Sequence, residues 1–155
     1  MIPAEIKTRT REGSYRMSDI QWTEDMSVGV EQLDGHHRRL IDLTNQLGTA
    51  IASHDAEQVT GAVLGELIRY VYYHFGEEER LMEEVGYAEL TEHRQHHRAM
   101  AEHVRGLEDR YNNDPGAVIT ADLQHFLADW LVNHIRHEDR RYKTALATLK
   151  VAAEV

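Results

Sequence analysis

The sequence contains no cysteine, and this absence narrows the chemistry that the chain can perform. Disulfides, thiolate metal ligands and thiol nucleophiles are all excluded. A metal bound by this protein must therefore be held by nitrogen and oxygen donors from histidine, aspartate or glutamate. The chain of 155 residues is long enough to bury a core without cross-links, so we expect a single domain.

Basic residues are few as well, because 17 lysines and arginines face 27 aspartates and glutamates and leave a formal net charge of −10. Such a surface repels phosphate backbones and anionic lipids, so we expect neither nucleic acid nor a membrane as a partner. No stretch approaches the about 18 consecutive apolar residues of a membrane span, and the N-terminus lacks the apolar segment of a signal peptide. We therefore expect a cytoplasmic protein.

Proline occurs only at Pro3 and Pro115, and β-branched residues never cluster in alternating runs, so strands have little support. Apolar residues instead recur at intervals of three and four, which predicts amphipathic helices. Helices joined by short loops bury their apolar faces most simply in an antiparallel up-down-up-down four-helix bundle. An irregular arm should precede the bundle and run through Trp22 to about Val30. The predicted helices cover about residues 32–53, 56–85, 89–112 and 118–149, with Gly86 ending the second.

The domain organisation follows from the same pattern. Residues 17–155 would make a complete domain, and residues 1–16 are expected to form a flexible N-terminal extension.

Histidines lie on the apolar faces of the predicted helices, where an unpartnered imidazole would be unfavourable by several kcal/mol. For one such histidine, a hydrogen bond inside the core is the simpler explanation. That explanation weakens for several together, because the core offers few neutral polar partners. One or two divalent cations would satisfy them together, and both zinc and iron accept such donors. A structural zinc site usually closes with four ligands, so the excess of donors favours two metals. The inward-facing residues are His37, His74, Glu78, His93, His97 and His134.

Four sequence blocks, in order along the chain, resemble the hemerythrin family and in particular its single-domain bacterial members. The blocks are WTEDMSVGVEQLDGHHRRL, YYHFGEEERLM, GYAELTEHRQHH and WLVNHIRHED, and the resemblance covers about Trp22 to Leu149. An isolated HxxxH or HxxxE pair would be a weak indication, because 11 histidines in 155 residues produce such pairs by chance. Four blocks in order are much more specific.

The resemblance implies a non-haem centre of two iron ions with a bridging oxo or hydroxo group, and dioxygen as its ligand. One iron would be left a ligand short, and dioxygen would bind there. The implied ligands are His93, His97 and His134 for one iron, His37 and His74 for the other, and Glu78 and Asp139 as bridges. The residues at positions that line the oxygen pocket in relatives are Leu40, Phe75, Trp130 and Ile135.

Asp139 is assigned by the resemblance and not by helical periodicity. It lies five residues after His134, which is about 140° around an ideal α-helix, so periodicity alone would choose His137 or Glu138. His137 could hydrogen-bond bound oxygen or speed autoxidation, or its side chain could turn to solvent. His36 stands where relatives often have glutamine. The remaining ionisable residues expected at the surface are His54, His96, His103 and His125, and the acidic residues Glu77, Glu79, Glu83 and Glu84.

These observations favour an oxygen-binding protein rather than an enzyme, namely a reversible dioxygen carrier, store or sensor. Five neutral imidazoles with only two carboxylates make a less anionic site than the carboxylate-rich di-iron centres of ferritin-like bundles, which favours reversible binding. The alternative is a di-iron oxidase or peroxidase that consumes oxygen, peroxide or nitric oxide. A third hypothesis is an interaction module that reports oxygen or iron to an unidentified oxygen-consuming or signalling protein.

Overall fold

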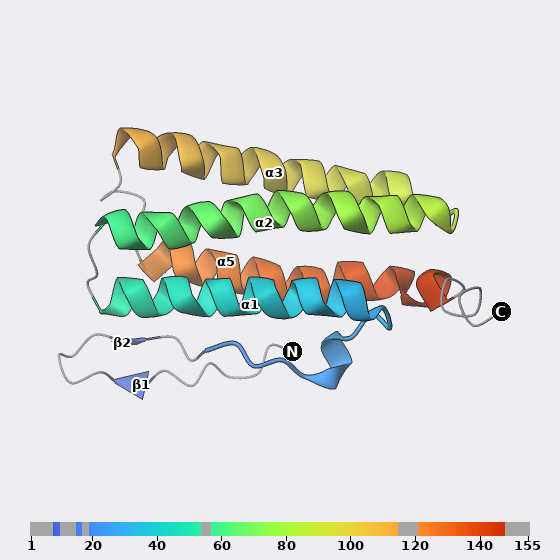
Figure 1. Ribbon diagram of the computed structural model, residues 1–155, viewed down its shortest axis with the longest axis horizontal. Coiled ribbons are helices and arrows are strands. Elements are labelled where there is room, and N and C mark those ends of the chain that lie inside the picture. Colours follow the sequence, from blue (N-terminus) through green and yellow to red (C-terminus); the bar gives the residue numbers. More distant parts are fainter. Residues whose placement is uncertain (1–7, 10–14, 17–18, 54–56, 115–120, 148–155) are drawn as a thin grey trace.

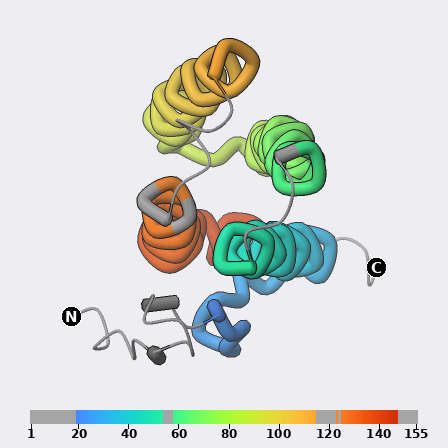
Figure 2. The backbone as a smooth tube through the Cα atoms, turned by 90° about the vertical axis from the view of Figure 1, so that its left-hand side faces the viewer, coloured from blue at the N-terminus to red at the C-terminus, as the bar shows by residue number. Residues whose placement is uncertain are grey.

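The protein is described by a computed structural model in which residues 8–9, 15–16, 19–53, 57–114 and 121–147 are placed. Long helices lie side by side and alternate in direction along the chain (Figure 1). They are α1 (Glu31–Ala52), α2 (Glu57–Glu84), α3 (Leu90–Asn113) and α5 (Ala121–Asn133). Seen end-on, the four helices surround a common interior (Figure 2), and α1 packs against both α2 and α5 while α2 packs against α3. The predicted antiparallel four-helix bundle is confirmed.

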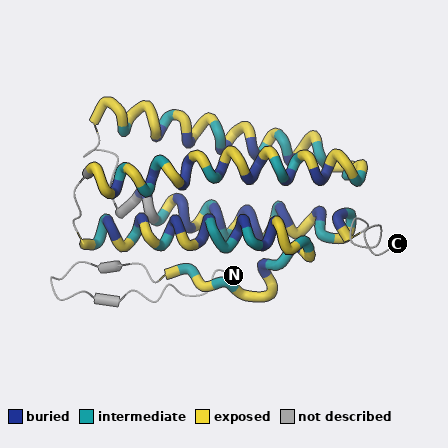
Figure 3. Tube along the Cα trace, in the orientation of Figure 1, coloured by how far each residue is buried: buried dark blue, intermediate teal, exposed yellow. Residues whose placement is uncertain are grey.

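The helices pair because each carries an apolar face at helical spacing. The buried residues form stripes along the helices, and exposed residues cover the outside (Figure 3). Leucines of all four helices meet in one core cluster, which includes Leu40, Leu67, Leu107 and Leu127. Within the described ranges, no helix combines the length and the apolar character needed to cross a bilayer.

The predicted irregular arm lies along α1 and contains a single turn of 3-10 helix, η1 (Glu24–Met26). Asp34 of α1 holds the end of the arm, because its carboxylate accepts hydrogen bonds from Ser27 Oγ at 2.6 Å and from the Val28 backbone N–H at 2.9 Å. Further back, Asn45 exchanges two hydrogen bonds with the backbone of Ile20. Two separate contacts therefore fix the arm to α1.

Of the predicted N-terminal extension, residues 1–16, the structure describes only two short strands. They are β1 (Thr8–Arg9) and β2 (Tyr15–Arg16), and they pair antiparallel with Thr8 opposite Arg16. The remaining residues of the extension lie outside the described part of the chain, so its flexibility stays a prediction.

Gly86 ends α2 in the way that the sequence predicted. Its φ of 66° lies in the left-handed region that glycine adopts without a steric penalty. The N–H of Gly86 donates to the carbonyl of Glu83, and the N–H of Tyr87 donates to the carbonyl of Met82. This Schellman arrangement satisfies carbonyls at the helix end and turns the chain toward α3.

The last helix departs from the regular helix predicted over residues 118–149. After α5 the chain passes into η2 (His134–Glu138), a π-helical turn, and η3 (Asp139–Tyr142), a 3-10 turn, before residues 143–147 return to α-helix. The prediction of one regular helix was wrong here, and residues 118–120 and 148–149 lie outside the described residues. A π turn is a local wide turn in an α-helix and occurs frequently at functional sites.

Candidate metal centre

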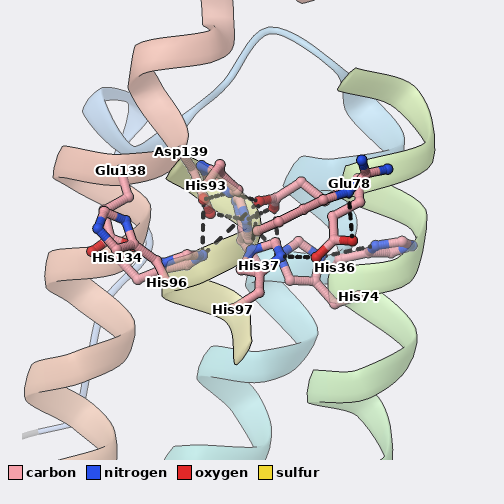
Figure 4. Close-up of polar contacts among 12 residues, drawn as sticks. His36, His37, His74, Glu78, His93, His96, His97, His134, Glu138 and Asp139 are labelled. Atoms are coloured by element: carbon pink, nitrogen blue, oxygen red, sulfur yellow. Dashed lines mark hydrogen bonds and ion pairs between the residues drawn. The ribbon is translucent and has the colours of Figure 1, made fainter. Parts of the chain in front are cut away.

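Side chains from α1, α2, α3 and the turns η2 and η3 that follow α5 converge in the bundle interior (Figure 4). They form two overlapping groups, and within each group the potential ligand atoms lie within 4.8 Å of one another. Both groups contain Glu78 and Asp139. The three-histidine group adds His93, His97 and His134, and the two-histidine group adds His37 and His74. The structure thus brings together every residue that the sequence analysis named as a metal ligand, while the role of these residues as ligands stays a prediction.

Helix geometry explains how most of these side chains meet. His74 and Glu78 on α2 lie four residues apart, as do His93 and His97 on α3, so each pair leaves one face of its helix. The π turn brings His134 and Asp139 together, although they are five residues apart. The backbone N–H of Asp139 donates to the carbonyl of His134, which is the bonding pattern of a π turn.

Glu78 directs one carboxylate oxygen to each group. Its Oε2 lies 2.8 Å from His74 Nε2 of the two-histidine group. Its Oε1 lies 2.5 Å from His93 Nε2 and 3.2 Å from His97 Nε2 of the three-histidine group. A carboxylate in this arrangement can bridge two cations.

The two carboxylate oxygens of Asp139 face different groups in the same way. Its Oδ2 lies 2.9 Å from His37 Nε2, and its Oδ1 lies 2.9 Å from His134 Nε2. The Nε2 atoms of His37 and His74 also face each other at 3.2 Å. Both carboxylates therefore link the same two clusters of imidazole nitrogens.

Many of these atoms point at a common place rather than at each other. His97 Nε2, His134 Nε2, Glu78 Oε2 and both carboxylate oxygens of Asp139 are buried and have no partner in hydrogen-bond geometry, although several lie within 3.2 Å of another polar atom. Unsatisfied buried polar atoms are rare and unfavourable. Nitrogen and oxygen lone pairs that converge in this way fit divalent metal ions, which would satisfy them together.

The electrostatics of the site reflect strong coupling between imidazoles and carboxylates. Burial alone would lower the pKa of His37 and His93, but the carboxylates of Asp139 and Glu78 outweigh burial and raise both pKa values to about 9. Burial would likewise raise the pKa of the two carboxyl groups, but the surrounding imidazoles lower it. The pKa of His74 is lowered by burial, and the positive charge of His37 adds to this effect. Protons on these imidazoles thus supply part of the positive charge that a bound cation would bring.

Three side chains contact the Nδ1 atoms of site histidines, on the side of each ring away from the centre. We call them outer partners, and two of them were not predicted. Glu79 accepts from His97 Nδ1 at 2.7 Å, and Glu138 accepts from His134 Nδ1 at 2.5 Å. The third is His36, whose Nδ1 lies 3.2 Å from His74 Nδ1. The prediction that Glu79 belongs to a solvated face was wrong, because its side chain is only 26% exposed and also accepts from Arg94.

Sequence spacing pointed to one of these partners only. Glu138 lies four residues after His134, so periodicity placed it beside that histidine, although as a ligand and not as an outer partner. Glu79 contacts His97 of another helix, and residue spacing within α2 cannot predict such a contact. Tyr142, three residues after Asp139, is fully buried, and its hydroxyl has no hydrogen-bond partner among the described residues. Burial, together with the negative charges of Asp139 and Glu78, raises the pKa of Tyr142.

The other histidines divide between the core and the surface. The side chain of His137 is exposed, so of its two predicted roles the structure favours the turn toward solvent. His103 is exposed, whereas His96 and His125 are intermediate in exposure, and His54 lies outside the described residues. His36 is only 7% exposed but belongs to neither group.

An apolar cavity of about 10 Å³ lies one helical turn from the centre, toward the middle of the bundle. This space corresponds to roughly one water-sized sphere. Neighbouring helices run in opposite directions. Residues that follow a histidine of the centre on one helix therefore lie at the same level of the bundle as residues that precede such a histidine on the next helix. Lining residues three or four positions from a histidine of the centre are Leu40, Val71, Met100, Trp130 and Leu131.

The four residues predicted to line an oxygen pocket are all near the centre, but only Leu40 and Trp130 line this cavity. Phe75 stacks on the ring of His97, with centroids 3.9 Å apart and planes 8° apart. Ile135 is fully buried in the core cluster. The roles of these four residues toward oxygen stay a prediction.

The fold and the site together define a class of protein: a four-helix bundle whose interior histidines and carboxylates can hold metal. Residues 28–146 match the family model described as hemerythrin HHE cation binding domain. The chain belongs to the hemerythrin family.

Relatives and solved structures agree with this assignment. The chain is 36% identical over 126 residues to a bacteriohemerythrin of Stenotrophomonas maltophilia, covering 81% of this chain and 80% of the relative. It is 32% identical over 129 residues to a hemerythrin-like protein of Naegleria gruberi, covering 83% and 95%. A crystal structure of wild-type hemerythrin superposes with a TM-score of 0.76 at 29% identity and covers 83% of this chain and 98% of that one.

Proposed function

We propose that this protein binds dioxygen reversibly at two iron ions, as a carrier, store or sensor. The three-histidine group would hold one iron and the two-histidine group the other, while Glu78 and Asp139 would bridge them together with an oxo or hydroxo group. When bound, the irons would supply the electrons that dioxygen takes up and later returns.

The most direct support for this proposal is that the two oxygens of each shared carboxylate face different groups. Glu78 Oε2 and Asp139 Oδ2 face the two-histidine group, whereas Glu78 Oε1 and Asp139 Oδ1 face the three-histidine group. A site for a single metal would need only one oxygen of each carboxylate. The two-histidine group also has fewer protein donors, which would leave a position for a small ligand.

Aromatic and apolar side chains around the site support reversibility, because water promotes the loss of bound oxygen as peroxide. Phe75 covers the ring of His97, and Trp130 stacks on His134 with planes 17° apart and centroids 5.0 Å apart. The cavity next to the centre is lined mainly by aliphatic side chains, including Leu40. These residues would keep the oxygen site poor in water.

The alternative function is a di-iron oxidase or peroxidase that consumes oxygen, peroxide or nitric oxide. A titratable His137 close to the oxygen site would lend this alternative mild support, because it could speed autoxidation. The exposed side chain of His137 removes that support, so reversible binding remains the preferred proposal.

A purification under anaerobic conditions followed by metal analysis and exposure to air tests the proposal. The reduced protein should contain about two irons per chain, develop a visible colour in air, and lose and regain that colour over repeated cycles of vacuum and air. Irreversible conversion to the ferric state with turnover of oxygen would favour the enzyme, and protein that takes up no iron would contradict both functions.

Glu78→Gln provides the site-directed variant, and Glu84→Gln provides its control, because the side chain of Glu84 on α2 is 53% exposed. Loss of one charge from Glu78 should abolish the colour cycle, because both groups depend on this carboxylate. The control should cycle like the unaltered protein. A cytoplasmic location and an unidentified oxygen-consuming or signalling partner stay predictions.

A further inference from the structure

His36 occupies a buried position directly behind a residue of the two-histidine group. It is 7% exposed, and its Nδ1 lies 3.2 Å from His74 Nδ1, on the side of the His74 ring away from His37 and Glu78 (Figure 4). Ring contacts with Tyr70 and Tyr73, at centroid distances of 5.8 and 5.1 Å, hold the imidazole of His36 in place. This position can control the orientation of His74.

The distance between the two Nδ1 atoms constrains where hydrogens lie. His74 Nε2 is the nitrogen that faces the two-histidine group, 3.2 Å from His37 Nε2 and 2.8 Å from Glu78 Oε2. If His74 Nε2 keeps a free lone pair for a metal, the hydrogen of its neutral ring must be on Nδ1. That hydrogen needs an acceptor because the ring is fully buried, and His36 Nδ1 is within reach.

Behind two of the three histidines of the three-histidine group, the corresponding position is filled by a carboxylate. Glu79 accepts from His97 Nδ1, and Glu138 accepts from His134 Nδ1. An anionic acceptor increases the basicity of the ring that donates to it more than a neutral imidazole does. His74 therefore has the weaker type of outer partner.

We propose that His36 is a positioning residue of the two-histidine group: its Nδ1 accepts the Nδ1–H of His74 and thereby keeps His74 Nε2 available for metal. The neutral character of this acceptor makes the two-histidine group the weaker of the two metal sites. The inference rests on the proposed metal centre and deepens it by giving the two sites different affinities and assigning a cause to one of them.

Anaerobic titration with ferrous ion, and with Co²⁺ as a spectroscopic probe, tests this role in the full chain. The unaltered protein should take up two equivalents in two steps of different affinity. His36→Leu retains bulk but has no acceptor, and it should weaken only the second equivalent, by about 10 to 100-fold. His36→Gln offers an amide oxygen as acceptor and should restore the second equivalent to within about 10-fold of the unaltered protein. The visible spectrum of the second Co²⁺ should change in the leucine variant only.

His103→Leu is the matched control, because it removes an exposed histidine of α3 that lies in neither group. Circular dichroism of the metal-free variants shows whether each one folds, and His36→Met replaces His36→Leu if the leucine variant does not. Two unchanged equivalents in a folded leucine or methionine variant, or a glutamine variant as impaired as that variant, would overturn the role of His36. Unaltered protein that binds no metal would instead contradict the proposed function itself.

Discussion

The backbone N–H of Asp139 donates a hydrogen bond to the carbonyl oxygen of His134, and the Oδ1 of Asp139 lies 2.9 Å from the Nε2 of the same histidine. In a regular α-helix, side chains five residues apart diverge by about 140°. The π turn at residues 134–138 removes that divergence. A local departure from α-helical geometry therefore completes the centre.

Substitutions at Asp139 and Glu138 should separate a bridging carboxylate from an outer partner. Asp139→Asn should lower the affinity for iron by more than about 100-fold, whereas Glu138→Gln should lower it by about 10-fold, as is common for residues that only orient a ligand. The physical reason is that Asp139 contributes to both groups, whereas Glu138 contacts only His134 Nδ1. Iron analysis after dialysis against graded chelator concentrations measures the difference. Equal losses in the two variants would contradict the assignment of Asp139.

The metal-free protein, prepared with a chelator, should lose stability as the pH rises from about 6.5 to about 9. The pKa values of His37 and His93 are raised from 6.5 to about 9, so the protonated rings stabilise the folded state fully below pH 6.5 and lose this contribution as pH passes 9. The lowered carboxyl pKa values act only in acid, outside this range. We expect the melting temperature to fall by roughly 5 °C or more across the window.

Thermal melts at several pH values, followed by circular dichroism, measure this effect. The iron-loaded protein is the control and should not show the same loss, because metal binding requires neutral imidazoles and competes with protons at low pH instead. A melting temperature of the metal-free protein that stays level or rises between pH 6.5 and 9 would contradict the coupling between these histidines and the carboxylates.

A comparison of Leu40→Ala with Leu47→Ala should distinguish the effect of core packing on stability from the effect of the cavity on oxygen chemistry. Both leucines are buried on α1, but only Leu40 lines the cavity beside the centre. Each substitution should lower the free energy of unfolding by about 2–5 kcal/mol because it leaves a cavity in the core. Only Leu40→Ala should speed the decay of the oxygenated form, because it admits water near the centre.

Urea unfolding gives the stability of each leucine variant, and the rate at which the colour fades in air gives the autoxidation rate. The same rate in both variants, either unchanged or raised equally, would show that the cavity does not govern access of water to the site.

Alanine substitution at two glycines of α2 should have opposite effects on the stability of the protein. A Cβ at Gly61 would clash with the hydroxyl oxygen of Tyr111, whereas a Cβ at Gly76 meets no atom within 4 Å. Gly76→Ala should stabilise the protein by up to about 1 kcal/mol, because alanine loses less backbone entropy than glycine in a helix. Gly61→Ala should destabilise it by about 1–3 kcal/mol, because Tyr111 must leave its packed position.

Urea unfolding of the two glycine variants under identical conditions checks this pair. The double variant Gly61→Ala/Tyr111→Ala lacks the clash. It should therefore be more stable than Tyr111→Ala alone, by part of the gain in helix propensity that alanine gives over glycine. Stabilisation by Gly61→Ala in the otherwise unaltered protein would mean that Tyr111 does not pack closely against α2.

Much of the fold could be predicted from local sequence, because apolar spacing sets which face of each helix is buried and short loops force neighbouring helices to run antiparallel. Gly86 illustrates this, since glycine tolerates the positive φ that ends α2. The meeting of His74 with Glu78 and of His93 with His97 was predictable for the same reason, as residues four apart share a helix face. These features depend on single helices.

The tertiary structure alone decided what depends on contacts between helices. The π turn that turns Asp139 inward has no signal in helical periodicity, and the resemblance to a family supplied that residue. The pairing of Glu79 with His97, and of His36 with His74, joins residues of different helices, so no spacing within one helix could report it. Periodicity determines which side chains face inward, but only packing determines which atoms they meet there.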